Sequence, residues 1–552
     1  MENKPNLYKK RAKIMALAII FLFILLLSRL YYLQIHKSDE LSSGALNQRG
    51  KEIFISSRRG TIFDINNLPL TNDEKIPNLV IQKQGLLDDR DLYNQVLEMT
   101  KLSSYEFKEQ LSSDESLLVL PMDQRFDLEN NNKKLFLIDI VNRYNEDNLL
   151  SHVIGYINKS DNRGESGIEK LFDEFLNIDK MDSFIVEYDK SRTLILDGSY
   201  KVNQNTNPYN PSGVKLTIDK SIQGLVEKTM DKHSLNGAVI VADVDTSDIL
   251  ALASRPNFNQ NEIQSYFHDD SMALYNKAIQ VGYPPGSIFK IVVVLTALEG
   301  DSSIIEEEYF CKGYEEINGV RINCGGKHGR ITLEEAFAKS CNSVFIQLAL
   351  DVGSDNIIDM ARSLGFGQRI NIGLMEETEG NLPTANELLG AAVGNIAIGQ
   401  GKIEVTPLQI TNMMMTLVND GVSKPLKLIK GITNDTGYIL KKYNVQDEKR
   451  LISQESSEKL IQMMREVVKS GTGRYIELED IGGCGGKTGS AEGILKQEKT
   501  IHGWFSGYYP YKNPKYLVTV LIEDADSGSR TAAPIFEEII RGIYQLFPRH
   551  SE

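Results

Sequence analysis

The hydrophobic and polar positions of this chain change their pattern sharply after its first few dozen residues. Residues 14–27 are apolar throughout, and after a short polar interruption the apolar character continues to residue 33. A helix that crosses a membrane needs about 20 such residues. The stretch 14–33 supplies them, because the long side chain of Arg29 can extend its charge to the membrane interface. The pattern therefore predicts a transmembrane helix.

The charges beside this helix predict its orientation. Lysines and an arginine between positions 9 and 13 precede the apolar run, and a basic flank stays on the cytoplasmic side. We expect residues 1–13 to be a cytoplasmic tail, 14–33 to be the anchor of a single-pass protein of the cell membrane, and the remainder to be an extracytoplasmic body. A cleaved signal peptide is the alternative, but no small-x-small cleavage site comes after the run.

The next stretch, 45–205, is mainly polar. It contains short strand-like runs at 52–56 and 78–82, and also Asp- and Asn-rich stretches such as 129–133. The stretch contains no cluster of Ser, His or Cys residues at catalytic spacing. We therefore expect this part of the chain to be a structural scaffold.

Beyond residue 213 the pattern becomes that of a compact mixed domain. Strand-like apolar runs occur toward both ends of this region, at 214–219, 238–243, 249–254, 504–508 and 517–523. Helical patterns lie between and beside them, at 221–233, over most of 287–470 and at 534–546. Strands from distant parts of the chain, with helices between them, predict one antiparallel sheet with a helical region on its face, which is an α+β fold.

Composition and charge narrow the range of functions. The 552 residues are too many for one ordinary core, so two or more globular units are expected. A hydrophobic share of 41% is ordinary and predicts that most of the chain folds. The net charge of −14 argues against a general nucleic-acid binder, which needs a basic face.

Ser287 and Lys290 are the first candidates for catalysis. The segment 283–286, rich in proline and glycine, fixes the chain just before Ser287, and the residues after it suit a helix. Ser287 is therefore expected near a helix N-terminus, where free N–H groups stabilise negative charge, with Lys290 one turn away on the same face. A serine needs a base to become a nucleophile. A lysine can be that base when burial and a second cation lower its pKa, and Lys487 is the candidate second cation.

The motif Ser340-Cys341-Asn342 adds polar groups to this site. It lies between two helical patterns, so we expect it to form the short turn that joins them. In such a turn Ser340 can relay a proton, and the Asn342 amide can hold Lys290 and the substrate backbone.

The motif Lys487-Thr488-Gly489-Ser490 comes after a glycine-rich segment and is expected in a strand beside the cleft. Gly489 would let the substrate backbone approach the strand, and Lys487 and Thr488 offer hydrogen-bond donors to a substrate carboxylate. The backbone N–H groups of Ser287 and Ser490 are the expected oxyanion hole, because such a hole needs two donors already in place.

The order S-x-x-K, S-x-N, K-T-G is typical of penicillin-binding proteins and class A β-lactamases. The chain resembles class B penicillin-binding proteins, the monofunctional D,D-transpeptidases of bacterial cell walls, over almost its whole length beyond the anchor. Segments similar to those of the family are Arg59–Asp64, Gly164–Glu169, Tyr283–Lys290, Gly399–Gln409, Gly471–Gly473 and Ala532–Phe536. Ser490 departs from the family, which usually has Thr there, and this departure leaves the mechanism intact.

This resemblance implies a pedestal or dimerisation domain over 45–205 and a transpeptidase domain with the penicillin-binding fold over 213–548. It implies that Ser287 attacks a D-Ala–D-Ala stem peptide of peptidoglycan, releases the last alanine and passes the acyl group to an amine of a neighbouring strand. β-Lactams would acylate the same serine. The acyl transfer requires no cofactor. A partner glycosyltransferase and other cell-wall proteins in the membrane are expected partners, and nucleic acid is not.

Other functions use the same motifs. A D,D-carboxypeptidase or an anchored β-lactamase usually lacks a long pedestal, which this chain has. A membrane-anchored β-lactam sensor predicts further membrane spans and a cytoplasmic effector, and a scaffold of a wall-synthesis complex would not need a complete catalytic set. The sequence leaves open whether the wall is built for division, elongation or sporulation.

The resemblance implies that the acyl transfer does not need the four cysteines. A glycine-rich stretch contains three cysteines and one histidine that could bind a structural zinc ion as a Cys₃His set. They are Cys311, Cys324, His328 and Cys341. Their spacing differs from that of common zinc fingers. Asp301 could replace one of these ligands. A disulfide, Cys311–Cys324 or Cys324–Cys341, and inert buried thiols stay open as alternatives. Cys484 is expected to be a small packed residue, with a Cys341–Cys484 disulfide across the cleft as the alternative.

Overall fold

The computed structural model of the protein describes residues 4–38, 41, 44, 50–100, 102–112, 117–122, 135–188, 194–195, 211–443, 447–495 and 498–548. The chain forms two compact units. The first comprises residues 1–58, 75–141 and 179–205, and the second comprises 59–74, 142–178 and 206–552. Two parts of the stretch 45–205 therefore belong to the second unit. The Asp- and Asn-rich stretch 129–133 lies outside the described residues.

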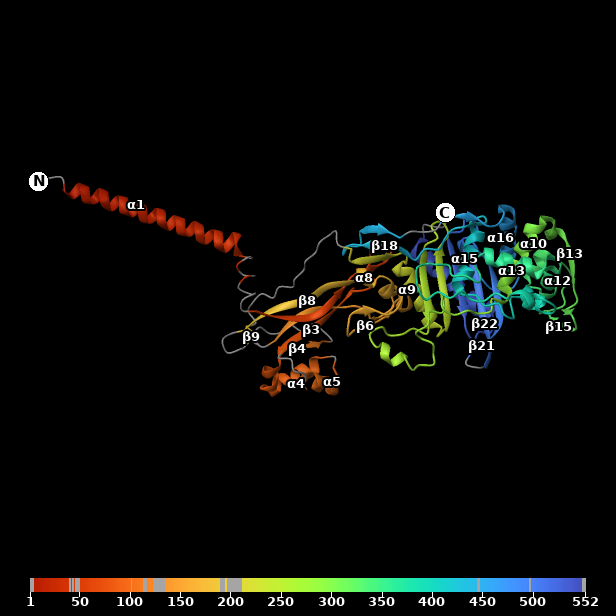
Figure 1. Cartoon of the computed structure of the whole chain (residues 1–552), viewed down its shortest axis with the longest axis horizontal. Helices are drawn as coiled ribbons and strands as arrows, with labels where there is room; N and C mark the ends of the chain where they lie inside the picture. The colour runs from red at the N-terminus through yellow and green to blue at the C-terminus, as the bar shows by residue number, and fades with distance from the viewer. Residues whose placement is uncertain are drawn as a thin grey trace. The chain divides into compact units, whose positions relative to one another are not determined.

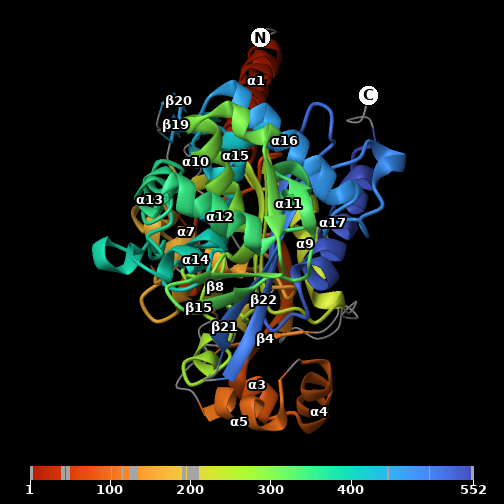
Figure 2. The same ribbon diagram turned by 90° about the vertical axis from the view of Figure 1, so that its right-hand side faces the viewer.

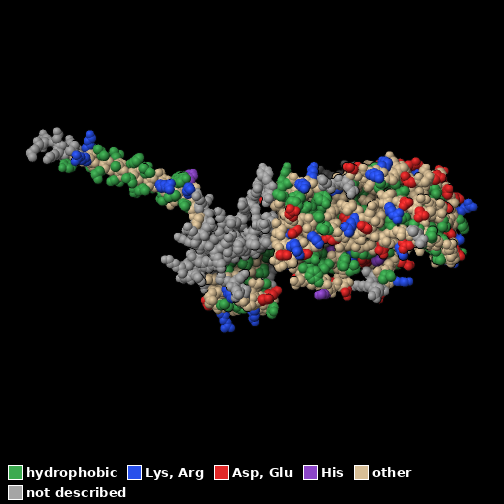
Figure 3. All heavy atoms as spheres, viewed as in Figure 1, with side chains coloured by type: hydrophobic (Ala, Val, Ile, Leu, Met, Phe, Trp, Pro, Cys, Tyr) green, Lys and Arg blue, Asp and Glu red, His purple; other side chains and the backbone are tan. Residues whose placement is uncertain are grey.

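The first unit begins with a long exposed helix. Helix α1 (Lys4–Tyr31) continues into a π-helical turn, η1 (Tyr32–His36). The segment Tyr8–His36 is long and apolar enough to cross a membrane, and an 18-residue stretch within it has a mean hydropathy of 2.5. Figure 3 shows hydrophobic side chains covering this helix, with basic side chains toward both of its ends. An exposed apolar surface of this length requires a lipid or protein environment, as the predicted anchor does.

Two small sheets form the rest of the described first unit. One pairs β1 (Gly50–Arg59), β8 (Asn177–Tyr188) and β9 (Leu194–Ile195). The other has the order β4-β3-β5, with bounds Leu117–Pro121, Glu74–Gln82 and Leu135–Asn142. Its apolar residues share a core with the helices α3 (Lys83–Leu87), α4 (Arg90–Met99) and α5 (Ser104–Ser112).

A five-stranded antiparallel sheet forms the centre of the second unit (Figure 1). Its order is β12-β11-β23-β22-β21, with bounds Ile249–Arg255, Gly237–Asp243, Tyr516–Ile522, Glu498–Tyr509 and Gly485–Leu495. Every neighbouring pair in it is antiparallel. The sheet therefore joins strands from both ends of the region, which confirms the predicted α+β fold.

Alternation along β11 divides the core between the two faces of the sheet. Val239 packs in the cluster that includes α9 (Lys220–Lys232) and α17 (Ala533–Leu546). Ile240 points the other way and packs in the cluster that includes the helical region. Figure 2 shows α9 and α17 on one side of β22, and α10, α12 and α15 on the other. The sheet is therefore covered by helices on both faces.

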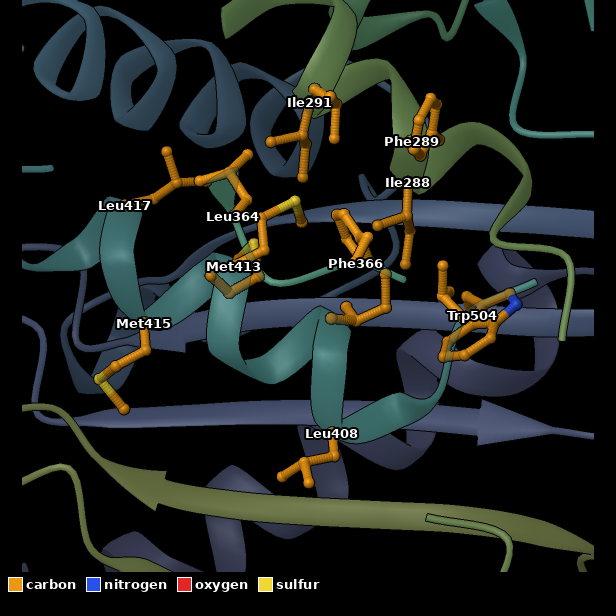
Figure 4. Packing of buried hydrophobic residues seen from close by; sticks show 14 of the residues in the cluster. Ile288, Phe289, Ile291, Leu364, Phe366, Leu408, Met413, Met415, Leu417 and Trp504 are labelled. Atoms are coloured by element: carbon orange, nitrogen blue, oxygen red, sulfur yellow. The ribbon is translucent and has the colours of Figure 1, made fainter. Parts of the chain in front are cut away.

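The helical region positions the segment that carries Ser287. Its helices have the bounds α10 (Lys290–Gly300), α11 (Leu333–Ala338), α12 (Asn342–Val352), α13 (Ser354–Ser363), α14 (Ala392–Ala397), α15 (Pro407–Val418) and α16 (Gln454–Lys469). Ile288 and Phe289 are fully buried. Figure 4 shows them in one cluster with Phe366, Met413 and Trp504. Because both residues after Ser287 lie in the core, its backbone is held in place.

Short strands interrupt the region that the sequence pattern predicts to be mainly helical. They are β13 (Glu308–Cys311), β14 (Tyr314–Ile317), β15 (Val320–Asn323) and β16 (Gly329–Thr332). β13 pairs with β16 and β14 with β15, both antiparallel. Asn318 and Gly319, with φ of 51° and 79°, form the two-residue turn between β14 and β15. Asn-Gly is a strong hairpin signal, and it corrects the helical prediction here.

A buried ion cluster joins two parts of the second unit. Glu169 is fully buried between two arginines: Arg59 Nε lies 2.8 Å from Glu169 Oε2, and Arg143 Nη2 lies 2.6 Å from Glu169 Oε1. The Tyr144 hydroxyl donates to the same oxygen at 3.2 Å. Strand β2 (Thr61–Phe63), just after Arg59, belongs to the sheet β19-β18-β10-β2, whose other strands are Ile439–Lys442, Ile429–Thr433 and Gly213–Leu216. The cluster thus fixes 59–74 to 142–178, and the sheet joins 59–74 to the rest of the second unit.

We predict that Glu169→Ala lowers the free energy of unfolding by about 3–5 kcal/mol, because it removes the carboxylate that pairs with two buried guanidinium groups. Arg59 then keeps only the partly exposed Asp173, 2.7 Å from its Nη2. Denaturant unfolding followed by Trp504 fluorescence measures this, since Trp504 is the only tryptophan of the chain and is fully buried. The control is Glu165→Ala, whose ion pair with Arg163 is largely exposed and which should cost less than about 1 kcal/mol. Equal losses in the two variants would contradict the prediction.

Candidate active site

Ser287 lies in a tight turn that opens helix α10. The turn, η3 (Gly286–Phe289), is a 3-10 helix that runs directly into α10 at Lys290. Gly286 has a φ of +54°, and a Cβ on it would lie 2.7 Å from the carbonyl oxygen of Ser490. Only glycine fits there without strain. The turn therefore lies directly against β21, and Ser287 lies at the expected helix start.

Lys290 is fully buried and all three of its N–H donors are used. Its Nζ donates to the Ser340 carbonyl at 2.7 Å, to Ser340 Oγ at 3.1 Å and to Asn342 Oδ1 at 2.7 Å. Burial lowers the pKa of Lys290 to about 7, because a charged ammonium is disfavoured away from water. Near neutral pH a large share of this lysine can therefore accept a proton.

Lys487 reaches the same hydroxyl from the sheet. Its Nζ donates to Ser340 Oγ at 3.2 Å and to the Thr488 carbonyl at 3.0 Å. Burial, and then the charge of Lys290, hold the pKa of Lys487 well below its usual range. Two ammonium groups around one hydroxyl repel each other in a dry site, so the two lysines titrate as a pair that does not readily hold both charges.

A sharp bend between α11 and α12 presents Ser340 to both lysines. Ser340 has a φ of +53°, a left-handed conformation that is uncommon for a residue with a side chain. Asn342 begins α12, and its Nδ2 donates to the Asn323 carbonyl at 3.1 Å. The motif is therefore the short interhelical turn that the sequence predicts. Backbone strain of this kind is often found at functional sites.

Strand β21 carries the last of the predicted residues along the cleft. Gly489 lies so close to the turn before Ser287 that a Cβ on it would meet the Pro285 carbonyl oxygen at 3.0 Å. The Thr488 hydroxyl lies 2.6 Å from the Thr472 hydroxyl. The Ser490 hydroxyl accepts a hydrogen bond from the Gly528 N–H at 3.0 Å. Each side chain that the sequence predicts on this strand thus has a fixed neighbour.

Hydrogen bonds join Lys290, Ser340, Asn342 and Lys487 into one cluster. Ser287 lies one turn before Lys290, and within the described residues its hydroxyl makes no hydrogen bond. Thr472 had no predicted role of its own, although it lies in the segment Gly471–Gly473 that resembles the family. The contact between Thr472 and Thr488 could not be inferred from sequence, because it depends on how the end of α16 meets β21.

Three cysteines and a histidine form a second cluster, beside the Ser340–Asn342 turn. The ligand atoms of Cys311, Cys324, His328 and Cys341 all lie within 4.8 Å of one another. Cys324 Sγ lies 3.7 Å from His328 Nδ1 and 3.7 Å from Cys341 Sγ, so the two sulfurs are not bonded. The hydrogen bond between the thiols of Cys324 and Cys341 lowers the pKa of Cys324.

Two residues considered with this cluster lie outside it. Asp301 caps the N-terminus of η4 (Ser302–Glu306), where it accepts from the Ser303 N–H at 2.9 Å. Cys484 is buried in the core cluster on the other side of the sheet, and burial raises its pKa to about 12. Asp301 is therefore no ligand of this cluster, and Cys484 is the packed residue that was expected.

Comparison with known proteins gives consistent matches. The family model "Penicillin binding protein transpeptidase domain" matches residues 237–541, more than half of the chain. The chain is 26% identical to stage V sporulation protein D of Bacillus subtilis, over 97% of this chain and 85% of that protein. It is 24% identical to the peptidoglycan D,D-transpeptidase FtsI of Escherichia coli, over 98% and 92%. The solved structure of PBP2 from Helicobacter pylori has the same fold, with a TM-score of 0.68 at 22% identity, over 90% and 99% of the two chains.

Proposed function

The chain belongs to the penicillin-binding protein transpeptidase family, and from this premise we propose that its D,D-transpeptidase reaction on peptidoglycan uses Ser287 as the nucleophile. The observation that carries this assignment is the pair of buried lysines, Lys290 and Lys487, which both donate to the Ser340 hydroxyl. Lys290 lies one helical turn after Ser287. A scaffold has no need for a buried lysine with a lowered pKa. Such groups are characteristic of sites where protons are transferred.

The first half of the reaction forms an ester on Ser287. Its hydroxyl oxygen attacks the carbonyl carbon between the last two D-alanines, and the neutral amine of Lys290 takes the hydroxyl proton. The tetrahedral intermediate then breaks its C–N bond. The leaving D-alanine receives a proton through Ser340, whose hydroxyl touches both lysines. In the second half an amine of a neighbouring stem peptide attacks the ester and Ser287 regains its proton.

Backbone groups on both sides of the cleft stabilise the intermediate. We assign the oxyanion hole to the N–H groups of Ser287 and Ser490, and the loss of one such donor typically costs about 10²–10³ in rate. The close approach of Gly489 to the Pro285 carbonyl, 3.0 Å from where a Cβ would lie, supports this assignment because it brings β21 next to the turn of Ser287. Thr488, oriented by Thr472, then offers its hydroxyl to the substrate carboxylate.

The chemistry of the substrate determines the membrane position and the partners that we propose. Peptidoglycan is built outside the cytoplasmic membrane, so we propose that α1 anchors the chain with its basic end in the cytoplasm and the catalytic unit outside. PBP2 of Helicobacter pylori has been solved in complex with MreC. We propose that this chain likewise works with other wall-synthesis proteins, including a glycosyltransferase that supplies the glycan strands.

We predict that Ser287→Ala abolishes covalent labelling of the full-length protein by fluorescent penicillin, because no other group can form the acyl-enzyme ester. Labelling is measured by gel fluorescence, and the labelled peptide is identified by mass spectrometry. The control is Ser303→Ala, an exposed serine bonded to Asp301, which should label like the wild type. Persistent labelling of Ser287→Ala would refute the nucleophile assignment.

We also propose that Cys311, Cys324, His328 and Cys341 hold a structural zinc ion. Ligands at 2.0–2.3 Å from a tetrahedral zinc ion lie roughly 3.3–3.8 Å apart, and two of the separations here are 3.7 Å. Cys341 lies within the catalytic turn and Cys324 next to Asn323, which accepts from Asn342. An ion held by these side chains would fix the hairpin β14–β15 to that turn without taking part in the chemistry.

We predict about one zinc ion per chain in the purified full-length protein, measured by mass spectrometry of the metal. His328→Ala and Cys311→Ser should each lower this content severalfold, because a structural zinc site needs four ligands. Cys484→Ser should retain it, because Cys484 lies outside the cluster. A metal-free wild type in which thiol counting shows two cysteines oxidised would instead support the disulfide alternative.

A further inference from the structure

A buried tyrosine supports the segment that leads into the nucleophile turn. Tyr283 lies four residues before Ser287, and its side chain is buried. Its hydroxyl donates to Glu523 Oε1 at 2.7 Å, and Lys277 Nζ lies 2.5 Å from the other oxygen of Glu523. Lys277 and Glu523 are also buried. The three side chains form a closed group that the proposed mechanism does not use.

The charges of this group are balanced within it. Lys277 neutralises Glu523, and the carboxylate still has an oxygen for the tyrosine. Burial, and then the charge of Glu523, raise the pKa of Tyr283, so its hydroxyl keeps its proton and can only donate to the carboxylate. A hydrogen bond to a charged acceptor is shorter and stronger than a neutral one. The carboxylate therefore fixes the direction of the Tyr283 ring.

Neutral hydrogen bonds hold the backbone that comes after this ring. The Tyr283 N–H donates to the Val405 carbonyl at 2.9 Å, and the Val405 N–H donates back at 2.8 Å. The indole N–H of Trp504 donates to the Pro284 carbonyl at 3.0 Å. The Gly286 N–H donates to the Gly399 carbonyl at 2.9 Å. The segment before Ser287 is therefore held along its whole length.

The Tyr283 ring also contacts the sheet. It meets His502 and Trp504 of β22 edge to face, with ring centroids 5.2 Å and 6.3 Å away. In the pairing of β22 with β21, Trp504 lies opposite Gly489 and His502 opposite Ala491. Ser490, between those two, carries one of the two proposed oxyanion donors. Tyr283 thus contacts the strand that pairs with Ser490, which carries one proposed oxyanion donor. It also belongs to the segment that leads to Ser287, which carries the other donor.

We infer that Lys277, Glu523 and Tyr283 are positioning residues that set the distance between the N–H groups of Ser287 and Ser490. This inference rests on the proposed function, and it adds to it a group that contacts neither substrate nor reacting atoms. Stability alone gives no reason for the pair, because a buried Lys–Glu pair is often no more stabilising than apolar residues of the same volume. The benefit lies in the fixed direction of the tyrosine hydroxyl.

The test uses the full-length protein and fluorescent penicillin. Tyr283→Phe should lower the first-order acylation rate constant by about 10- to 100-fold, because a misplacement of about 1 Å at a reacting centre can cost that much. The affinity of the complex before acylation should change by less than about twofold, since no group that contacts the drug is removed. A purely structural role would not separate these two constants.

The matched control is Tyr508→Phe. Tyr508 is a buried tyrosine of the same strand as His502 and Trp504, and its hydroxyl donates to the Ile461 carbonyl at 3.0 Å. The variant removes a buried tyrosine hydrogen bond to a neutral carbonyl, away from the nucleophile segment. The acylation rate constant should therefore stay within about twofold of the wild type. A rate constant for Tyr283→Phe equal to that of Tyr508→Phe would overturn the inference.

A second variant keeps the test valid if Tyr283→Phe is less stable than expected. Lys277→Met/Glu523→Leu removes both charges together, so that neither is left buried and unpaired. Its acylation rate constant should fall as far as that of Tyr283→Phe, and the triple variant should fall no further, because the three side chains act as one unit. Independent, multiplying losses would contradict the inference. Failure of the wild type to label at Ser287 would refute the proposed function itself.

Discussion

The site depends on one constraint: two lysine side chains must stay buried around a single hydroxyl. Lys290 and Lys487 lie 3.1 Å and 3.2 Å from Ser340 Oγ, where two full charges would repel strongly in a medium of low dielectric constant. The protein compensates with acceptors, the Ser340 and Thr488 carbonyls and the Asn342 amide. These acceptors stabilise one protonated lysine in the pair. Burial lowers the pKa of the lysines, so that a proton can also leave the pair near neutral pH.

That constraint explains why the fold brings three distant segments together. The start of α10 supplies Lys290, the bend between α11 and α12 supplies Ser340, and β21 supplies Lys487. Each segment has its own support: the core residues after Ser287, the cysteine–histidine cluster beside Ser340, and the strand pairing of β21. The Tyr283 group adds a support on the sheet side. A dry site with strained backbone is therefore held from several directions.

Much of this could be predicted from sequence because local patterns encode it. Periodicity and motif order predict the strands of the central sheet, the α+β fold, the interhelical turn of Ser340 and the approach of Lys290 to Asn342. They miss the short strands β13–β16. The partners of Thr472 and Glu523 could not be predicted, since they depend on contacts between segments far apart in the chain. The same is true of Glu169, because its partner Arg59 lies 110 residues away in the sequence. Both residues lie in the stretch 45–205, which was expected to be a separate pedestal.

The most direct test of the lysine pair is the pH dependence of acylation by fluorescent penicillin. Only the deprotonated base can accept the Ser287 proton, and burial lowers the pKa of Lys290 from its usual range to about 7. The acylation rate constant should therefore rise about tenfold per pH unit below that value and level off above it. A rate constant that keeps rising to about pH 10, as an ordinary exposed lysine would give, or one that falls with rising pH, would contradict the account.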